Sequence, residues 1–177
     1  MPTGDEAVYL SAGVLLPGVV DQAVWYLKVR RLEPGADPKY VHVRGSRRAL
    51  YLADTITPAT RVVALTEGEF DALLLWHGLR AHRWPQPVGV ATFGSATNRL
   101  RDPWAGRLTG KKLLTLYDSD EAGQAATAWW TGHFPDVQTI SLTPPRQGVA
   151  VKDVTDYWRA GGRVVDLIAG AIGHRYG

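Results

Sequence analysis

Beyond residue 60, short apolar runs alternate with stretches of helical period. The apolar runs predict four strands, at 61–66, 88–92, 113–117 and 137–142. The remaining stretches predict helices at 69–79, 102–110, 153–160 and 163–172, and a further helix that begins at about residue 121. Strands and helices that alternate at this spacing form βαβ units with right-handed crossovers. We therefore expect an α/β fold in which helices flank a mostly parallel sheet.

Two of the predicted helices carry an apolar stripe that we expect to face the sheet. The first has Phe70, Leu73 and Leu74 at positions i, i+3 and i+4. The helix from about residue 121 has the clearest stripe of the chain, which consists of Ala122, Ala125, Ala126, Trp129 and Trp130.

The first sixty residues have the shorter period of β-structure. Runs at 13–20 and 23–32 flank Asp21 and Gln22 and predict a hairpin, and 39–43 predicts a further short strand. Within 23–32, apolar Trp25, Leu27 and Val29 alternate with Tyr26, Lys28 and Arg30, which predicts one apolar and one partly cationic face. Residues 49–52 fit an extended segment or a single helical turn. We expect a boundary at 57–59, with a basic β-rich subdomain at 1–60 and an α/β domain at 61–177.

Acidic residues follow two of the predicted parallel strands. Glu67 comes after the first strand, and Asp118 and Asp120 come after the third. Because the carboxyl ends of parallel strands lie at one edge of a sheet, we expect these side chains, Gly94 and Asp153 to converge there. Each acid also has a purely structural explanation, because Asp120 and Asp153 are well placed to cap helices.

Together, the three acids Glu67, Asp118 and Asp120 would repel one another, so a positive group should lie between them. No lysine or arginine lies within either acidic turn. Mg²⁺ prefers carboxylate oxygens together with waters and phosphate oxygens. The pattern therefore favours a divalent-metal site for phosphoryl chemistry.

The composition of the chain limits the kinds of fold, partner and site that it can have. With 177 residues, 45% of them hydrophobic, the chain can bury one core and carry a small extension. Its net charge of +3 comes with a basic excess between residues 28 and 61, which suits an anionic partner. There is no cysteine, which excludes disulfides and thiolate zinc sites.

No apolar run reaches the roughly 20 residues of a membrane span, and no leader opens the chain. We therefore expect a soluble, cytoplasmic protein without a membrane partner.

Three competing motifs are weaker. The stretch GRLTGKK at 106–112 lacks the spacing of a phosphate-binding loop. The five histidines do not have the spacing of zinc ligands. A strand that ends in aspartate is also typical of phospho-acceptor receiver domains, but these need neither a glutamate after the first strand nor a basic β-rich extension.

The acidic motifs resemble those of a known family. EGEFDA at 67–72 and DSDEAGQAA at 118–126 resemble the Toprim domain, which has a glutamate after its first strand and Asp-x-Asp after its third. The second motif is similar to that of bacterial and phage-type DNA primases. ATFGSAT at 91–97, Lys152-Asp153 and Pro38-Lys39-Tyr40 are also similar to stretches of these primases. The resemblance implies a Toprim fold, which is Rossmann-like, with a small β-rich N-terminal subdomain.

The resemblance also implies an activity, namely metal-dependent nucleotidyl transfer that makes RNA primers from ribonucleoside triphosphates on a single-stranded DNA template. The catalytic, metal-binding acids would be Glu67, Asp118 and Asp120, with Asp71 and Asp153 as secondary acids and Mg²⁺ or Mn²⁺ as the cofactor. A replicative helicase is an implied further partner. The residues implied to contact nucleic acid or nucleotide are Lys28, Arg30, Lys39, Arg47, Arg48 and Lys152.

The sequence departs from these primases in several places. It carries neither a cysteine-bearing zinc module nor a helicase-contacting domain, and it has Ser46-Arg47 where the family usually presents a lysine. We therefore expect a primase core fragment, or one domain of a mobile-element primase. Two alternatives stay open, a Toprim-type nuclease or topoisomerase and a non-catalytic module that binds single-stranded nucleic acid or docks a helicase. A topoisomerase would need a nucleophilic tyrosine on a separate domain.

Overall fold

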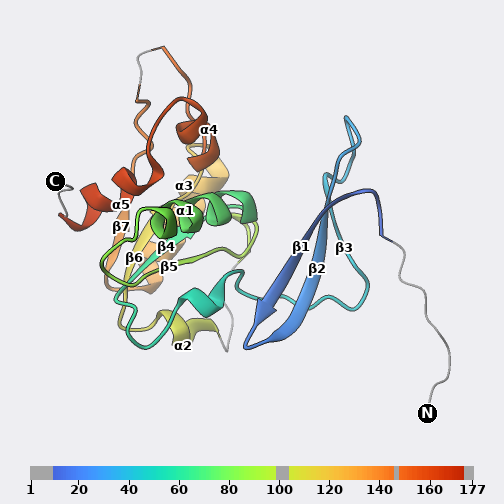
Figure 1. The fold of residues 1–177 in the computed structure, drawn as a ribbon, viewed down its shortest axis with the longest axis horizontal. Coiled ribbons are helices and arrows are strands. Elements are labelled where there is room, and N and C mark those ends of the chain that lie inside the picture. Colours follow the sequence, from blue (N-terminus) through green and yellow to red (C-terminus); the bar gives the residue numbers. More distant parts are fainter. Residues whose placement is uncertain (1–9, 99–103, 146–147, 174–177) are drawn as a thin grey trace. The chain divides into compact units, whose positions relative to one another are not determined.

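The computed structural model describes residues 10–98, 104–145 and 148–173 (Figure 1). The chain forms two compact units, one up to Ala49 and the other from Leu50 onward. This division lies about ten residues before the expected boundary. The reason is that residues 50–56 pair with the parallel sheet: Tyr51 and Thr92 exchange two backbone hydrogen bonds, and the Thr55 hydroxyl bonds the backbone of Val90.

The first unit contains three antiparallel strands in the order β1-β2-β3 (β1, Gly13–Val20; β2, Ala23–Arg31; β3, Tyr40–His42). The predicted hairpin is confirmed, because β1 and β2 are joined directly by Asp21 and Gln22. Both turn residues have positive φ, 51° and 64°. A two-residue turn of this kind matches the right-handed twist of the two strands that it joins.

Strand β2 places Lys28 and Arg30 on one face and Leu27 and Val29 on the other, as expected, but the cationic face is partly buried. Tyr26, Lys28 and Val29 are buried, whereas Trp25 and Leu27 are half-buried. Lys28 is only 5% exposed, and its ammonium lies 4.4 Å from the centre of the Tyr40 ring on β3. The electron-rich face of the ring compensates the cation for part of its lost hydration.

The second unit contains a four-stranded parallel sheet in the order β5-β4-β6-β7. Its strands are β4 (Val62–Thr66), β5 (Val88–Ala91), β6 (Lys112–Leu116) and β7 (Val137–Thr139). Its helices are α1 (Glu69–Ala81), α2 (Trp104–Leu108), α3 (Glu121–His133), α4 (Val154–Arg159) and α5 (Val164–Ile172), and a 3-10 turn, η1, spans Ala53–Thr55. The predicted α/β fold is confirmed. The fourth strand ends earlier than predicted because it is an edge strand whose neighbour, β6, ends at Leu116.

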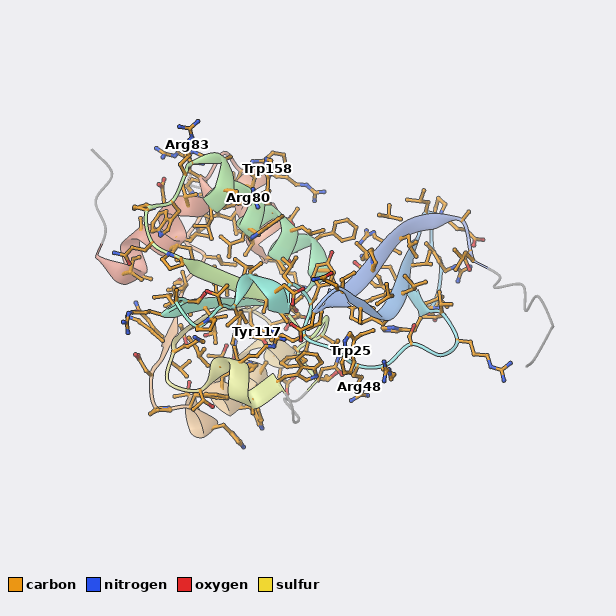
Figure 2. All side chains as sticks on the ribbon, turned by 60° about the horizontal axis from the view of Figure 1, so that its bottom comes forward. Trp25, Arg48, Arg80, Arg83, Tyr117 and Trp158 are labelled. Carbon is orange, nitrogen blue, oxygen red and sulfur yellow. The ribbon has the colours of Figure 1, made fainter. Side chains whose placement is uncertain are left out.

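The helices cover both faces of this sheet. The crossover from β4 to β5 runs in the opposite direction to the crossover from β6 to β7, and right-handed crossovers therefore put α1 and α3 on opposite faces. Figure 2 shows α1, α4 and α5 on one face and α2 and α3 on the other. None of the described helices is both long and apolar enough to cross a bilayer.

The buried stripes of α1 and α3 differ from the predicted ones. Helix α1 buries Ala72, Leu75 and Leu79, while Phe70, Leu73 and Leu74 are half-buried. Helix α3 buries Gly123, Ala126 and Trp130, while Ala122 and Ala125 are exposed. The reason is that glycines set the closest approach: a β-carbon on Gly78 would collide with Val164 of α5.

Candidate functional site

The acidic turns lie where the direction of the crossovers reverses. Glu67 follows β4, and Asp118 and Asp120 follow β6, the neighbouring strand. Open α/β sheets bind ligands at such a switch point, outside the carboxyl ends of the strands. Burial raises the pKa of Glu67, and the nearby carboxylates of Asp118 and Asp120 raise it further. The structure therefore brings the three acids together.

The start of α3 holds the Asp118–Asp120 turn in place. Asp120 is the N-cap of α3, and its side chain accepts a hydrogen bond from the backbone N–H of Gly123 at 3.0 Å. This bond lowers the pKa of Asp120. A β-carbon on Gly123 would collide with the backbone carbonyl oxygen of Asp118. The glycine of the DSDEAGQAA motif therefore allows the first turn of α3 to lie directly against the turn that carries the acids.

Two more of the predicted acids lie at this edge, one at the start of α4 and one at the start of α1. Asp153 is the N-cap of α4 and accepts a hydrogen bond from the backbone N–H of Asp156 at 2.7 Å. Asp71, in the first turn of α1, accepts hydrogen bonds from the backbone N–H and the hydroxyl of Thr155, at 3.0 and 2.6 Å. Burial raises the pKa of Asp71 to about 6, against the opposing effect of these bonds. Asp71 therefore ties α1 to α4.

Lys152 lies among the acids. Its ammonium is 2.9 Å from Oδ2 of Asp118 and 3.4 Å from Oδ2 of Asp120. These pairs raise the pKa of Lys152 above its usual range. The sequence analysis did not predict this contact, because it considered only cations within the two acidic turns. Lys152 comes from a loop more than thirty residues after Asp120. Its position next to Asp153, at the same sheet edge, was the available signal.

The donors at this edge fit a hard divalent cation. Burial raises the pKa of Asp118 as well, and Oε2 of Glu67 is buried without a hydrogen-bond partner among the described residues. Within the described ranges, no group of three or more His, Cys, Asp or Glu side chains is already arranged to hold a metal ion. Mg²⁺ needs no such cage, because it is commonly bound through one or two carboxylates, waters and phosphate oxygens. The residues present therefore fit Mg²⁺ or Mn²⁺, with Lys152 sharing two of the acids.

In the first unit, the predicted basic residues lie against aromatic rings or are exposed. The guanidinium of Arg47 lies 4.6 Å from the centre of the Trp25 ring, and Arg30 donates a hydrogen bond to the hydroxyl of Tyr40 at 2.8 Å. Lys39 and Arg48 are exposed, and Figure 2 labels Arg48 and Trp25. The sequence did not predict these aromatic partners, because each ring lies on a different segment of the chain from its cation: Trp25 is on β2 and Arg47 follows β3, whereas Tyr40 is on β3 and Arg30 is on β2.

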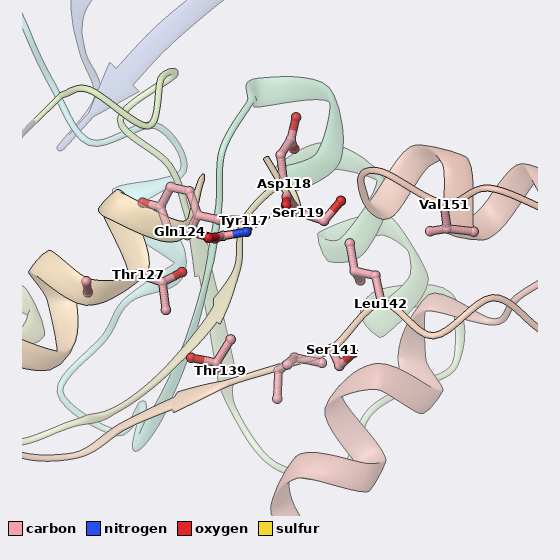
Figure 3. A pocket seen from close by; sticks show the side chains of 11 residues that line it. Tyr117, Asp118, Ser119, Gln124, Thr127, Thr139, Ser141, Leu142 and Val151 are labelled. Carbon is pink, nitrogen blue, oxygen red and sulfur yellow. Dashed lines mark hydrogen bonds between the residues drawn. The ribbon is translucent and has the colours of Figure 1, made fainter. Parts of the chain in front are cut away.

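A cavity of about 450 Å³ lies beside the acids, at the carboxyl ends of β6 and β7 (Figure 3). Asp118 and Ser119 line it from the acidic turn, Gln124 and Thr127 from α3, and Ile140 and Leu142 from the segment after β7. The predicted strand at 137–142 did not indicate this cavity, since it placed Ile140 and Leu142 inside the sheet.

No protein-family model and no curated protein sequence matches this chain. Among solved structures, the primase fragment of the bacteriophage T7 primase-helicase protein matches with a TM-score of 0.62 and 18% identity over 87% of this chain. The chain has the fold of a phage-type primase domain. The primase domains of T7 gp4, solved with the lagging-strand DNA polymerase, an RNA/DNA hybrid and dTTP, match with a TM-score of 0.55 and 15% identity, over 88% of this chain and 74% of that one. The match spans 61% of the T7 primase fragment, so this chain corresponds to part of the length of that fragment.

Proposed function

We propose that this chain is the catalytic core of a DNA primase, which joins ribonucleoside triphosphates on a single-stranded DNA template with Mg²⁺ or Mn²⁺ as the cofactor. The observation that carries the proposal is the gathering of Glu67, Asp118 and Asp120 at the switch point of a primase-type fold. Metal held there would neutralise triphosphate charge and help to align a 3′-hydroxyl for attack.

The chain's own residues have distinct parts in this proposal. The three acids bind the metal, and Asp71 positions the start of α4, and with it Lys152 and Asp153, through Thr155. Lys152 contacts phosphate when it leaves the acids. The basic residues of the first unit hold the phosphates of the template or nucleotide, contacts that position nucleic acid without reading its sequence. By analogy with the T7 protein, a helicase is a further proposed partner.

The test is extension of a preformed RNA primer on single-stranded DNA, with labelled ribonucleotides and Mn²⁺. Extension needs no initiation step, which suits a chain that spans part of its structural relative. Glu67→Gln should lower the rate by more than about 100-fold, because even outer-shell partners of metal ligands are typically worth 10–100-fold. Asp136→Asn, at an exposed acid, is the matched control. Equal rates for the wild type and Glu67→Gln would contradict the proposal, and shortening of the DNA instead of extension would indicate a nuclease.

One observation favours a second function, that of a non-catalytic module. Lys152 already pairs with Asp118 and Asp120, so a protein cation serves where the proposal needs a metal. A non-catalytic module would bind single-stranded DNA equally well after Glu67→Gln or the addition of EDTA, and it would extend no primer. Fluorescence anisotropy with a labelled oligonucleotide, run beside the extension assay, separates the two functions.

A further inference from the structure

The cavity beside the acidic turns is open to the candidate metal site at one end. Asp118 and Ser119 belong both to the turn after β6 and to the cavity wall, and Figure 3 shows them together at one end, with Thr139 and Ser141 at the other. Val151, the neighbour of Lys152, closes another side. A ligand in this cavity would therefore have one end beside the acids and Lys152. Its volume of about 450 Å³ is in the range typical of small-molecule sites.

The walls of the cavity suit an uncharged group with both apolar and hydrogen-bonding parts. Their apolar part consists of Tyr117, Ala128, Ile140, Leu142 and Val151. Their polar part consists of uncharged hydroxyl and amide side chains, those of Ser119, Gln124, Thr127, Thr139 and Ser141. Among the described residues that line it, none is a lysine or arginine, and Asp118 is the one charged group. Phosphates have no cation to meet inside the cavity, whereas Lys152 lies at the acidic end.

Hydrogen bonds hold parts of these walls in place before any ligand arrives. The hydroxyl of Tyr117 accepts a bond from the indole N–H of Trp130 at 2.9 Å, and both side chains are buried. The amide of Gln124 donates to the carbonyl oxygen of Ser119 at 3.1 Å, which links α3 to the acidic turn. A largely formed site loses less entropy when a ligand binds.

We propose that this cavity binds the base and ribose of an incoming ribonucleoside triphosphate, while its phosphates lie outside, with Lys152 and the metal-binding acids. The ring of Tyr117 and the aliphatic walls can pack against the face of any base, and the hydroxyl and amide groups can bond to the ribose hydroxyls, which leaves the pairing edge of the base for the template. The inference rests on the function proposed above and adds the position of the nucleoside.

The test fills the cavity without touching the acids. Ala128 lines the cavity from an exposed position of α3, and Ala125 is exposed on the same helix without lining it. Titration calorimetry with Mn²⁺ should show that Ala128→Trp weakens ATP and CTP binding by about tenfold, the order expected for the loss of base stacking. Inorganic tripolyphosphate should bind this variant as it binds the wild type, which also shows that the variant is folded. Ala125→Trp should change neither affinity.

A second readout locates the base directly. An azidopurine triphosphate, activated by light with Mn²⁺ present, should label peptides that contain residues 124–128 or 139–142, and excess ATP should suppress the labelling. Labelling elsewhere, or unchanged nucleotide affinity in Ala128→Trp, would overturn the nucleoside site while tripolyphosphate binding still supports the metal site. Failure of the wild type to bind either nucleotide or tripolyphosphate would overturn the proposed function and this inference with it.

Discussion

The two units of the chain arrange their charges in opposite ways. In the second unit, five acids gather at one edge of a parallel sheet, and burial raises the pKa values of Glu67, Asp71 and Asp118. In the first unit, cations lie over aromatic rings, as Arg47 does over Trp25. The acids are concentrated by topology, since strand ends and helix starts meet at the switch point. The cations are distributed along a hairpin and the segment that follows it.

This difference predicts different responses to substitution. The acids are held by backbone structure, through the caps of α3 and α4 and the close approach of Gly123, so they should act as a unit. The cations either lie against individual rings or are exposed, and each should contribute a graded amount to the binding of phosphates.

The largest expected effect separates the two units directly. Asp118→Asn combined with Asp120→Asn should weaken Mn²⁺ binding by more than about 100-fold, because it removes two candidate ligands. Arg47→Ala combined with Arg48→Ala should leave Mn²⁺ affinity unchanged and weaken binding to single-stranded DNA. It should also reduce the slope of log affinity against log salt by about 1.4, as expected for two lost phosphate contacts. Mn²⁺ titration by electron paramagnetic resonance and fluorescence anisotropy measure the two affinities. Loss of Mn²⁺ binding in the arginine variant would break the comparison.

The next effect tests whether backbone packing holds the acids. Gly123→Ala should lower the free energy of unfolding by about 3 kcal/mol and weaken Mn²⁺ binding, because its methyl group collides with the Asp118 carbonyl oxygen. Gly132→Ala is the matched control in the same helix, since a β-carbon there has no neighbour within 4 Å. It should be neutral or stabilise the protein by up to about 1 kcal/mol. Urea unfolding gives both values, and equal effects of the two substitutions would contradict this explanation.

Local signals in the sequence predicted much of this structure. The Asp21-Gln22 hairpin, the four parallel strands and the capping positions of Asp120 and Asp153 are confirmed, because turns, strand runs and N-caps depend on residues close together in the chain. The convergence of the acids followed from the parallel order of the strands. The metal-binding role of these acids stays a prediction.

The errors involve contacts between residues far apart in the sequence. The face of α1 that is buried depends on the close packing of Gly78 against Val164, eighty-six residues later. The burial of Lys28 depends on Tyr40 of another strand, and the ion pairs of Lys152 depend on the turn after β6. Periodicity reports which residues of one element are apolar, but it does not report what another element brings to them.

Asp71 provides a smaller effect, seen in the pH dependence of stability. Its pKa of about 6 in the folded protein lies above the ordinary value of 3.8, so the folded state holds this proton more tightly than the unfolded chain does. The associated stability is fully present below about pH 4 and is lost as the pH rises through about 6. Asp71→Asn keeps an acceptor for Thr155 and removes the charge. At pH 7.5 it should therefore raise the free energy of unfolding by about 2 kcal/mol relative to the wild type.

Urea unfolding between pH 4 and 7.5, in EDTA so that no metal competes, measures this effect. The difference between Asp71→Asn and the wild type isolates Asp71 from Glu67 and Asp118, whose pKa values are also raised by burial. Asp136→Asn is the control at an exposed acid. A difference that does not change between pH 4 and 7 would show that Asp71 is not the source of the pH dependence.

The smallest effect concerns the cation among the acids. Lys152 is 56% exposed, and exposed ion pairs contribute little to stability, so a metal should displace its ammonium from Asp118 at small cost. Lys152→Met should therefore tighten Mn²⁺ binding by about twofold to fivefold, whereas Arg159→Met, which removes an exposed cation of α4, should not change it. The same Mn²⁺ titration provides the measurement. Weaker Mn²⁺ binding in Lys152→Met would mean that the lysine organises the acids instead of competing with the metal. The acidic edge would then resemble the part of the first unit where Lys28 and Arg47 depend on aromatic partners.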